Sequence, residues 1–468
     1  MAYYDDLKKF KNRIAAIDDS GRMITYSELD MICYKLQHMI NSRSLVMSFC
    51  ENSVGSLIGY IAFLYNKVVP ILLDRHIDGE LRERLISIYN PEYVYMPEDM
   101  KNNLEYEKVI FQENGYLLVK MPYVQEVKMY GELGLLLTTS GSTGSPKLVR
   151  QSYDNIQANA ESIAEYLGLD ETEKPITTLP MNYTYGLSII NSHLLVGATI
   201  VMTKYTLMQR EFWDSFRKNE ATSFGGVPYT YEMLKKLRFF RMELPSLRTM
   251  TQAGGKLSPE LHKEFAEYAK ENGKRFVVMY GQTEATARMA YLPAELALEK
   301  YGSMGKAIPG GKLELIDTNG EVIKEADTVG ELVYSGPNVT LGYAECVGDL
   351  SLGDERHGRL ETGDMAKCDK DGYFYIVGRK KRFLKIFGNR VNLDETERLI
   401  KKQFEDIDCA CTGVDDKMSI YVTDERYDRD ISSFVSHKLG LHNSAFEVKY
   451  IDEIPKNEAG KTLYSSLK

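Results

Sequence analysis

Apolar and polar positions follow two periodicities in the first third of the chain. Leu29, Ile32, Leu36 and Ile40 recur at helical spacing, and Ser27 just before them is a suitable N-cap. Apolar runs predict strands, and amphipathic stretches between them predict helices. The predicted strands are Leu45–Cys50, Val68–Leu73 and Tyr93–Met96, and the predicted helices are Val54–Asn66 and Gly79–Ile88. This alternation predicts an α/β fold with a mostly parallel sheet and flanking helices.

The same patterns continue to the end of the chain. The α/β region continues with a helix that ends at Gly168 and with a strand–helix–strand unit over 248–280. Ser258 and Pro259 begin the helix of that unit. Shorter elements follow. They are a helix that starts with a capping box of Asp394 and Glu397, strands Asp408–Val414, Met418–Thr423 and Phe446–Ile451, and a helix near Asp430–Leu439. The pattern predicts a large α/β domain of mostly parallel sheets and a small C-terminal α+β domain.

Composition narrows the function classes. The 468 residues are enough for two or more packing units, and a net charge of −9 disfavours nucleic-acid binding, which needs a basic face. No signal segment opens the chain, and its longest apolar helix candidate, Val54–Tyr65, is too short to span a membrane. The cysteines lack Cys-x-x-Cys spacing and are typical of a reducing compartment. We therefore expect a cytoplasmic protein.

The first candidate for chemistry is the stretch Leu135–Gln151, LLLTTSGSTGSPKLVRQ. Its glycines, Gly141 and Gly144, let the backbone approach a ligand closely, and Lys147 adds a positive charge. Hydroxyl groups add donors at Thr139, Ser140, Ser142 and Thr143. These residue types predict a polyphosphate-binding loop.

Two other interpretations of this stretch are a plain surface turn and a Walker-type P-loop. A plain turn needs neither the lysine nor the hydroxyl groups. A Walker loop places Gly-Lys-Ser/Thr at the start of a helix, whereas Pro146 precedes Lys147 here and a strand-like run follows it. We expect the loop to join two strands.

Two further candidates follow predicted parallel strands, where ligands of open sheets bind. Gly254 and Gly255 follow the strand Arg248–Gln252, and the sequence Gly281-Gln282-Thr283-Glu284 follows the strand Arg275–Tyr280. Glu284 offers an oxygen ligand for Mg²⁺, Thr283 a hydroxyl group for phosphate, and Tyr280 a ring face for a purine. Alone, this segment is equally compatible with a solvated turn.

These motifs, in this order, resemble those of the adenylate-forming enzymes: acyl- and aryl-CoA ligases, adenylation domains of peptide synthetases, and luciferases. The resemblance covers nearly the whole chain. Besides the phosphate loop and YGQTEA (280–285), it rests on ETGD (361–364), the hinge-like segment 378–397 and the terminal PKNEAGKT (455–462). The glycine-containing segments 302–311 and 330–343 resemble the family's structural connectors.

The resemblance implies a mobile two-domain enzyme, with a large adenylation domain over 1–380 and a small C-terminal domain over 381–468 that turns about Lys381. It implies that Lys461, Glu284 and Thr283 are catalytic and that Glu284 holds the metal. The implied ATP- and AMP-binding residues are Thr139, Ser140, Gly141, Ser142, Thr143, Gly144, Lys147, Gly254, Gly255, Tyr280, Gly281, Gln282, Asp364 and Arg379. Asp364 and Arg379 would contact the ribose.

The implied acyl pocket contains Tyr183, Thr184 and Gly186. Members that activate amino acids usually have an aspartate near Thr184 to pair with the ammonium group, and a buried ammonium without such a partner is costly. An α-amino acid substrate is therefore disfavoured. His193 follows in an apolar run and is more typical of a core histidine than of a catalyst.

The implied reaction is ATP-dependent ligation of a small carboxylic acid, through an acyl-AMP, to a thiol. The cofactors are ATP and Mg²⁺, and the acceptor is either CoA or the phosphopantetheine of a separate acyl carrier protein. Departures from the family pattern at Leu148, Tyr183 and Arg359 leave the acid and the acceptor open. The alternatives are a luciferase-like enzyme that oxidises the adenylate and a non-catalytic nucleotide- or acyl-binding protein.

Overall fold

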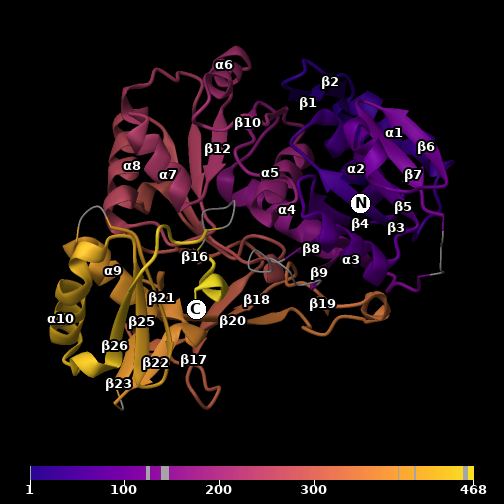
Figure 1. Ribbon diagram of the computed structural model, residues 1–468. Coiled ribbons are helices and arrows are strands. Elements are labelled where there is room, and N and C mark those ends of the chain that lie inside the picture. The colour runs from indigo at the N-terminus through magenta and orange to yellow at the C-terminus, as the bar shows by residue number, and fades with distance from the viewer. Residues whose placement is uncertain are drawn as a thin grey trace. The chain divides into compact units, whose positions relative to one another are not determined.

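The computed structural model describes residues 2–122, 127–138, 147–387, 389–404, 407–456 and 462–467. The chain packs into two compact units: Met1–Lys312 with Tyr334–Leu360, and Leu313–Val333 with Glu361–Lys468 (Figure 1). This division reflects packing and does not locate a hinge. The boundary between 380 and 381, expected for the mobile domain, stays a prediction.

The first unit contains a sheet with the strand order β19-β9-β8-β4-β3-β5-β7-β6. The pairs β3–β4, β3–β5 and β4–β8 are parallel, and the outer pairs are antiparallel. The strands are β3 (Leu45–Cys50), β4 (Val69–Asp74), β5 (Tyr93–Pro97), β6 (Lys108–Glu113), β7 (Tyr116–Lys120), β8 (Leu133–Thr138), β9 (Leu148–Ser152) and β19 (Gly342–Ala344).

A second large sheet of this unit has the order β16-β15-β14-β13-β12-β10-β11-β1-β2 and is parallel from β14 to β1. Its strands are β1 (Ile14–Asp18), β2 (Met23–Thr25), β10 (Pro175–Ile176), β11 (Ile200–Met202), β12 (Ser223–Gly226), β13 (Thr249–Gln252), β14 (Arg275–Tyr280), β15 (Ala290–Leu292) and β16 (Lys306–Ala307). Parallel strands need covered faces, and helices supply the cover.

The helices of this unit are α1 (Tyr26–Gln37), α2 (Val54–Tyr65), α3 (Gly79–Tyr89), α4 (Tyr153–Leu167), α5 (Thr184–Leu195), α6 (Arg210–Lys218), α7 (Pro228–Lys236) and α8 (Pro259–Glu271). The largest core cluster joins side chains of α1, α2, α4 and α5 to strands of both sheets. Figure 1 shows α4 and α5 side by side, in agreement with their many contacts. A second cluster packs α3 on the other face of the sheet that contains β3.

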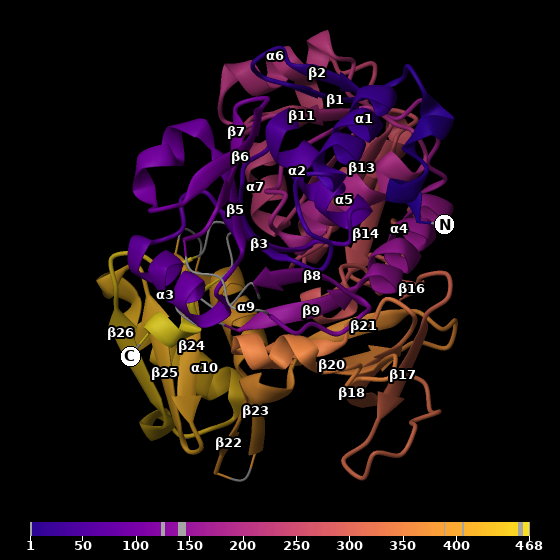
Figure 2. The same ribbon diagram turned by 90° about the vertical axis from the view of Figure 1, so that its right-hand side faces the viewer.

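The second unit, shown from another side in Figure 2, contains a sheet of the order β17-β18-β20-β21, the hairpin β22-β23 and the sheet β24-β25-β26. Its strands are β17 (Lys312–Ile316), β18 (Val329–Ser335), β20 (Arg359–Cys368), β21 (Phe374–Arg379), β22 (Phe383–Ile386), β23 (Asn389–Asn392), β24 (Cys409–Val414), β25 (Lys417–Val422) and β26 (Phe446–Tyr450). Helices α9 (Leu393–Gln403) and α10 (Asp428–Leu439) share a core cluster with β24–β26.

The predicted fold class is confirmed, but two predicted helix caps are wrong. Thr25, and not Ser27, caps α1, because its hydroxyl group accepts from Glu28 N while the Glu28 carboxylate accepts from Thr25 N. Asn392, and not Asp394, caps α9 through hydrogen bonds from the backbone of the next turn. In both cases the cap residue lies two residues before the predicted one, which is within the usual uncertainty of helix ends.

Candidate active site

The predicted phosphate loop, Thr139, Ser140, Gly141, Ser142, Thr143 and Gly144, lies outside the described residues. Its flanks are the antiparallel strands β8 and β9, so the prediction that the loop joins two strands is confirmed. Lys147, at its C-terminal end, immediately precedes β9.

Lys147 lies against Tyr343. Tyr343 is the last residue of the segment 330–343, which the sequence indicated to be a structural connector. The Lys147 ammonium lies 3.8 Å from the centre of the Tyr343 ring, and it is 3.6 Å from the carboxylate of Glu345. The guanidinium of Arg356 is 4.6 Å from the same ring centre. The electron-rich ring face attracts cations, so Tyr343 holds two positive side chains beside the end of the phosphate loop.

The hydroxyl group of Tyr343 donates a hydrogen bond of 2.8 Å to Oε1 of Glu284. Burial, and then the nearby Glu284 carboxylate, raise the pKa of Tyr343 to about 12, while Arg356 opposes the rise. The hydroxyl group is therefore protonated at neutral pH and acts as a donor to the carboxylate. Tyr343 thus connects the predicted metal ligand to the predicted phosphate-binding lysine.

Glu284 lies in a short 3₁₀ turn, Thr283–Ala285, directly after β14. Its carbonyl oxygen accepts hydrogen bonds from Thr340 N and from Arg356 Nη1, at 3.1 and 3.0 Å. Asn338 Nδ2 donates to the next carbonyl group, that of Ala285, at 2.9 Å. These contacts fix the turn at the carboxyl end of a parallel strand, where the sequence predicted a ligand site.

The neighbouring predicted residues surround the same strand end. Tyr280 is the last residue of β14, and its hydroxyl group accepts a 3.1 Å hydrogen bond from Gln282. Thr283 is 6% exposed. At Gly281 a Cβ atom would lie 1.6 Å from the carbonyl oxygen of Ala287, so only glycine allows this close approach of two chain segments.

The predicted acyl-pocket residues lie at the start of α5. Tyr183 is the N-cap residue, and Thr184 and Gly186 are buried in the first turn. A Cβ atom on Gly254, which has φ of +82°, would lie 2.7 Å from the Tyr183 hydroxyl oxygen. The structure therefore brings Tyr183 and Gly254 together, while Gly255 packs on Pro228. His193 is a core histidine, as the sequence indicated, with Nδ1 2.8 Å from the carbonyl oxygen of Ile189.

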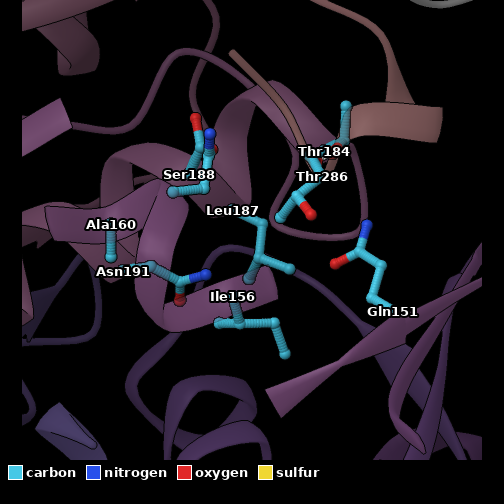
Figure 3. Close-up of a pocket in the computed structure, with 9 residues that line it drawn as sticks. Gln151, Ile156, Ala160, Thr184, Leu187, Ser188, Asn191 and Thr286 are labelled. Carbon is cyan, nitrogen blue, oxygen red and sulfur yellow. Dashed lines mark hydrogen bonds between the residues drawn. The ribbon is translucent and has the colours of Figure 1, made fainter. Parts of the chain in front are cut away.

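A small cavity adjoins Thr184 between α4 and α5, and its lining combines polar and apolar side chains (Figure 3). It has room for about one water molecule. Its lining residues are Gln151, Ile156, Asn159, Ala160, Thr184, Leu187, Ser188, Asn191 and Thr286. The amide nitrogen of Gln151 is buried and has no hydrogen-bond partner.

Sequence reasoning missed Arg288, which is 1% exposed. Its Nε donates to Ser188 Oγ at 3.1 Å, and its guanidinium lies 4.4 Å from the centre of the Tyr185 ring. The available signal was a charged residue in the otherwise apolar run from Ala287 to Leu292. Tyr343 and Arg356 were missed because only the chain fold brings them to Glu284.

Two predicted ribose-binding residues lie in the second unit. Asp364 and Arg379 are paired residues on β20 and β21, with Arg379 Nε 3.4 Å from Asp364 Oδ1. Asp364 is 5% exposed, whereas the Arg379 side chain is largely exposed. Lys381 lies in the turn Lys380–Arg382. Lys461 lies outside the described residues.

No group of three or more His, Cys, Asp or Glu side chains suited to holding a metal ion occurs in the described part of the chain. Across the same residues, no helix combines the length and apolar character that a membrane crossing requires.

The chain is similar to known proteins in sequence and in structure. Residues 4–344 match the family model described as "AMP-binding enzyme". The 2-succinylbenzoate–CoA ligase of Geobacillus sp. (strain WCH70) is 26% identical over 482 residues, which cover 97% of this chain and 94% of that protein. The peroxisomal OPC-8:0-CoA ligase 1 of Arabidopsis thaliana is 30% identical, over 71% of this chain and 63% of that protein.

A solved structure agrees with this result. The o-succinylbenzoate CoA synthetase of Bacillus subtilis, in complex with its acyl-adenylate intermediate, superposes with a TM-score of 0.81 at 20% identity, covering 100% of this chain and 98% of that chain. The fold is thus shared over the full length. The chain belongs to the AMP-binding enzyme family, as a ligase that joins a carboxylic acid to a thiol through an acyl-AMP.

Proposed function

We propose that this ligase activates a small carboxylic acid with MgATP and transfers the acyl group to CoA, with Glu284, Tyr343 and Lys147 at the centre of the phosphate site. The contact of Tyr343 with both Glu284 and Lys147 carries this proposal. It joins a carboxylate suited to a metal and a cation suited to phosphates at the end of a parallel strand.

The residues present fit a magnesium ion that is delivered with ATP. Mg²⁺ keeps several waters and is usually bound by one or two carboxylates together with substrate phosphates, so a dedicated cluster of acidic residues is not required. Glu284 would supply the carboxylate, and Tyr343 would orient it. When bound, the ion neutralises charge on the phosphates.

The polyphosphate would be bound by Thr139, Ser140, Gly141, Ser142, Thr143, Gly144, Lys147 and Thr283. The nucleoside would contact Gly254, Gly255, Tyr280, Gly281 and Gln282, and its ribose would contact Asp364 and Arg379. The acyl group would occupy a pocket that includes Tyr183, Thr184 and Gly186. Burial of the Asp364 carboxylate beside Arg379 supports the ribose assignment, because two fixed polar groups suit vicinal hydroxyl groups.

In the first step, an oxygen of the substrate carboxylate attacks the α-phosphorus of ATP. A new C–O–P linkage forms, the bond from the α-phosphorus to the bridging oxygen breaks, and pyrophosphate leaves. Positioning and charge neutralisation dominate such transfers, and Lys461 would stabilise the charge around the α-phosphate. In the second step, the thiol loses its proton to solvent and its sulfur attacks the acyl carbon. The bond from the acyl carbon to the phosphate oxygen breaks, AMP leaves with the electron pair, and a thioester remains.

CoA is favoured over an acyl carrier protein because the two curated relatives are both named CoA ligases. The proposal also includes a domain rotation between the two steps. In it, residues 381–468 turn about Lys381 relative to the large domain of residues 1–380. The cytoplasmic location expected from the cysteines also stays a prediction.

The test is ATP–pyrophosphate exchange with a panel of aliphatic, hydroxy, aryl and dicarboxylic acids, followed by thioester formation with CoA or with a phosphopantetheinylated carrier protein. We expect exchange with one class of acid and a thioester on CoA. A thioester formed on the carrier protein alone would contradict the CoA assignment. Bound ATP without exchange across the panel would contradict ligase activity. Oxygen consumption that depends on ATP would indicate luciferase-like chemistry instead.

A further inference from the structure

Among the side chains that the structure describes, two arginines are almost completely buried, and they differ in how their charge is balanced. Arg150 is 0% and Arg288 is 1% exposed. Arg150 forms an ion pair with Glu355 and also donates to the backbone carbonyl groups of Leu341, Tyr343, Leu352 and Gly353. A buried guanidinium with a carboxylate and several carbonyl acceptors is well compensated.

Arg288 has only neutral and weak acceptors. Its Nη1 lies 3.1 Å from the Tyr166 hydroxyl oxygen and 2.6 Å from the Met279 sulfur, and its Nε lies 3.1 Å from Ser188 Oγ. Within the described ranges, no carboxylate pairs with it. A guanidinium is permanently charged, and burying a charge without a counter-ion is costly. An anion that binds beside it would remove this cost.

The position of Arg288 connects it to the acyl pocket. Ser188, which accepts from its Nε, lies on α5 one turn after Thr184. The guanidinium lies 4.4 Å from the centre of the ring of Tyr185, which follows Thr184 in the first turn of α5. Its own backbone is fixed by Asn159, whose Nδ2 donates to the Arg288 carbonyl oxygen at 3.0 Å.

A small cavity shares Ser188 with the surroundings of the Arg288 side chain. Ser188, which accepts from the Arg288 side chain, lines it together with Thr184 (Figure 3). Asn159, which contacts the backbone of Arg288, lines it as well. Gln151 also lines it, is 1% exposed, and has a buried amide nitrogen without an acceptor. A buried donor without an acceptor, close to residues that contact Arg288, favours a polar group over a hydrocarbon group at this end of the acyl pocket.

We propose that the substrate is a dicarboxylic acid, whose second carboxylate binds Arg288 while the first is adenylated. This inference rests on the proposed function and names its substrate class. The guanidinium supplies the charge and the fork geometry that carboxylates accept. An acid in which the second carboxylate is missing leaves Arg288 unpaired and binds more weakly.

The test compares matched acids in ATP–pyrophosphate exchange with the wild-type enzyme. Each α,ω-dicarboxylate from oxalate to adipate is paired with the monocarboxylate in which a methyl group replaces one carboxylate, and 2-succinylbenzoate is paired with 4-oxo-4-phenylbutanoate. We expect kcat/KM for the best dicarboxylate to exceed that of its partner by about 10- to 100-fold, the scale of a charge-assisted hydrogen bond.

The variants Arg288→Gln and Arg288→Lys then separate recognition from structure. If Arg288 recognises the second carboxylate, Arg288→Gln reduces the ratio between the paired acids by about 10-fold or more, and Arg288→Lys keeps part of it. Equal losses with both acids of a pair would show a structural role and overturn the proposal.

Two outcomes with the wild-type enzyme alone would also overturn it, and they are distinguishable. Exchange with monocarboxylates at rates equal to or above those of their dicarboxylate partners would refute the assignment of Arg288 while leaving the ligase function intact. Exchange with no acid of either kind, with ATP still bound, would overturn the proposed function and this inference together.

Discussion

The Tyr343 hydroxyl group donates a 2.8 Å hydrogen bond to Oε1 of Glu284, although the two residues are far apart in the sequence. The same ring carries the Lys147 ammonium at 3.8 Å. One aromatic side chain therefore orients an acidic and a basic group that are both assigned to the phosphates of ATP. Its ring and its hydroxyl group act on different partners, and substitutions can separate the two effects.

Replacing Tyr343 with phenylalanine keeps the ring beneath Lys147 and removes the donor to Glu284. We expect the exchange rate at limiting Mg²⁺ to fall by about 3- to 10-fold, which corresponds to the net loss of one hydrogen bond. Excess Mg²⁺ should restore most of the rate, because the ring contact is intact. Tyr343→Leu is the comparison, and it should lose more activity at every Mg²⁺ concentration. Identical Mg²⁺ titrations for wild type and Tyr343→Phe would contradict the positioning role.

Lys147 tests the phosphate assignment directly. Lys147→Met should raise KM for ATP and lower exchange by about 10- to 100-fold, since a charge-assisted contact to the phosphates is lost. Glu345→Gln is a matched control, because Glu345 is the exposed ion-pair partner of Lys147, and exposed pairs contribute little. If Lys147→Met kept the wild-type KM for ATP, as the control is expected to do, Lys147 would not contact the nucleotide.

Lys461 is expected to act only in the first step. Lys461→Ala should reduce adenylation by about 10²- to 10³-fold, the scale of one preorganised electrostatic donor, while thioester formation from supplied acyl-AMP is largely spared. Lys456 provides a control in the same terminal segment, because its ammonium pairs with Asp408, and Lys456→Ala should leave adenylation near the wild-type rate. Near-normal adenylation by Lys461→Ala would refute the catalytic assignment.

The sequence predicted those parts of the fold that depend on local patterns. The apolar run Leu45–Cys50 and the run Arg275–Tyr280 are strands with the predicted bounds, because buried parallel strands are continuously apolar. Ser258 caps α8 as predicted, through a hydrogen bond from Leu261 N. Thr25 was missed because several hydroxyl-bearing residues near a helix start are equivalent caps, and only the backbone geometry selects one.

The sequence predicted only those residues of the candidate site that belong to a local motif. Glu284 and Lys147 belong to recognisable stretches, so the sequence indicates their chemistry. Tyr343 and Arg356 reach Glu284 only through the packing of segments that are far apart in the sequence. The segment 330–343, which ends at Tyr343, is typical of a connector between strands. Arg288 is inconspicuous in the sequence. It matters because it is buried without a counter-ion, and only the three-dimensional structure shows this.

Two buried histidines predict a loss of stability in mild acid. Burial lowers the pKa of both His193 and His262 to about 4. Below the unfolded pKa of about 6.5, the unfolded state binds protons that the folded state does not, so the free energy of unfolding falls as pH falls from 6.5 towards 4. At pH 5 this amounts to about 2 kcal/mol for each histidine.

Urea denaturation at pH 7 and pH 5 measures this effect. His262→Gln removes one of the two groups and should reduce the difference in unfolding free energy between the two pH values by about 2 kcal/mol relative to wild type. The exposed His437 of α10 provides the control substitution His437→Gln. An unchanged pH dependence in His262→Gln would show that His262 does not contribute.

The two buried arginines should respond in opposite ways to the same substitution. Arg150→Met removes an ion pair and leaves several buried carbonyl groups without donors, so we expect the free energy of unfolding to fall by about 2–4 kcal/mol. Arg288→Met removes a buried charge that has no counter-ion. The hydrogen bonds that it loses go only to two hydroxyl groups and a thioether. The enzyme without substrate should therefore be as stable as wild type or more stable. Urea denaturation of both variants without substrate measures the difference. If Arg288→Met were destabilised as strongly as Arg150→Met, the charge of Arg288 would already be compensated within the protein, and the case for an anionic substrate group beside it would be lost.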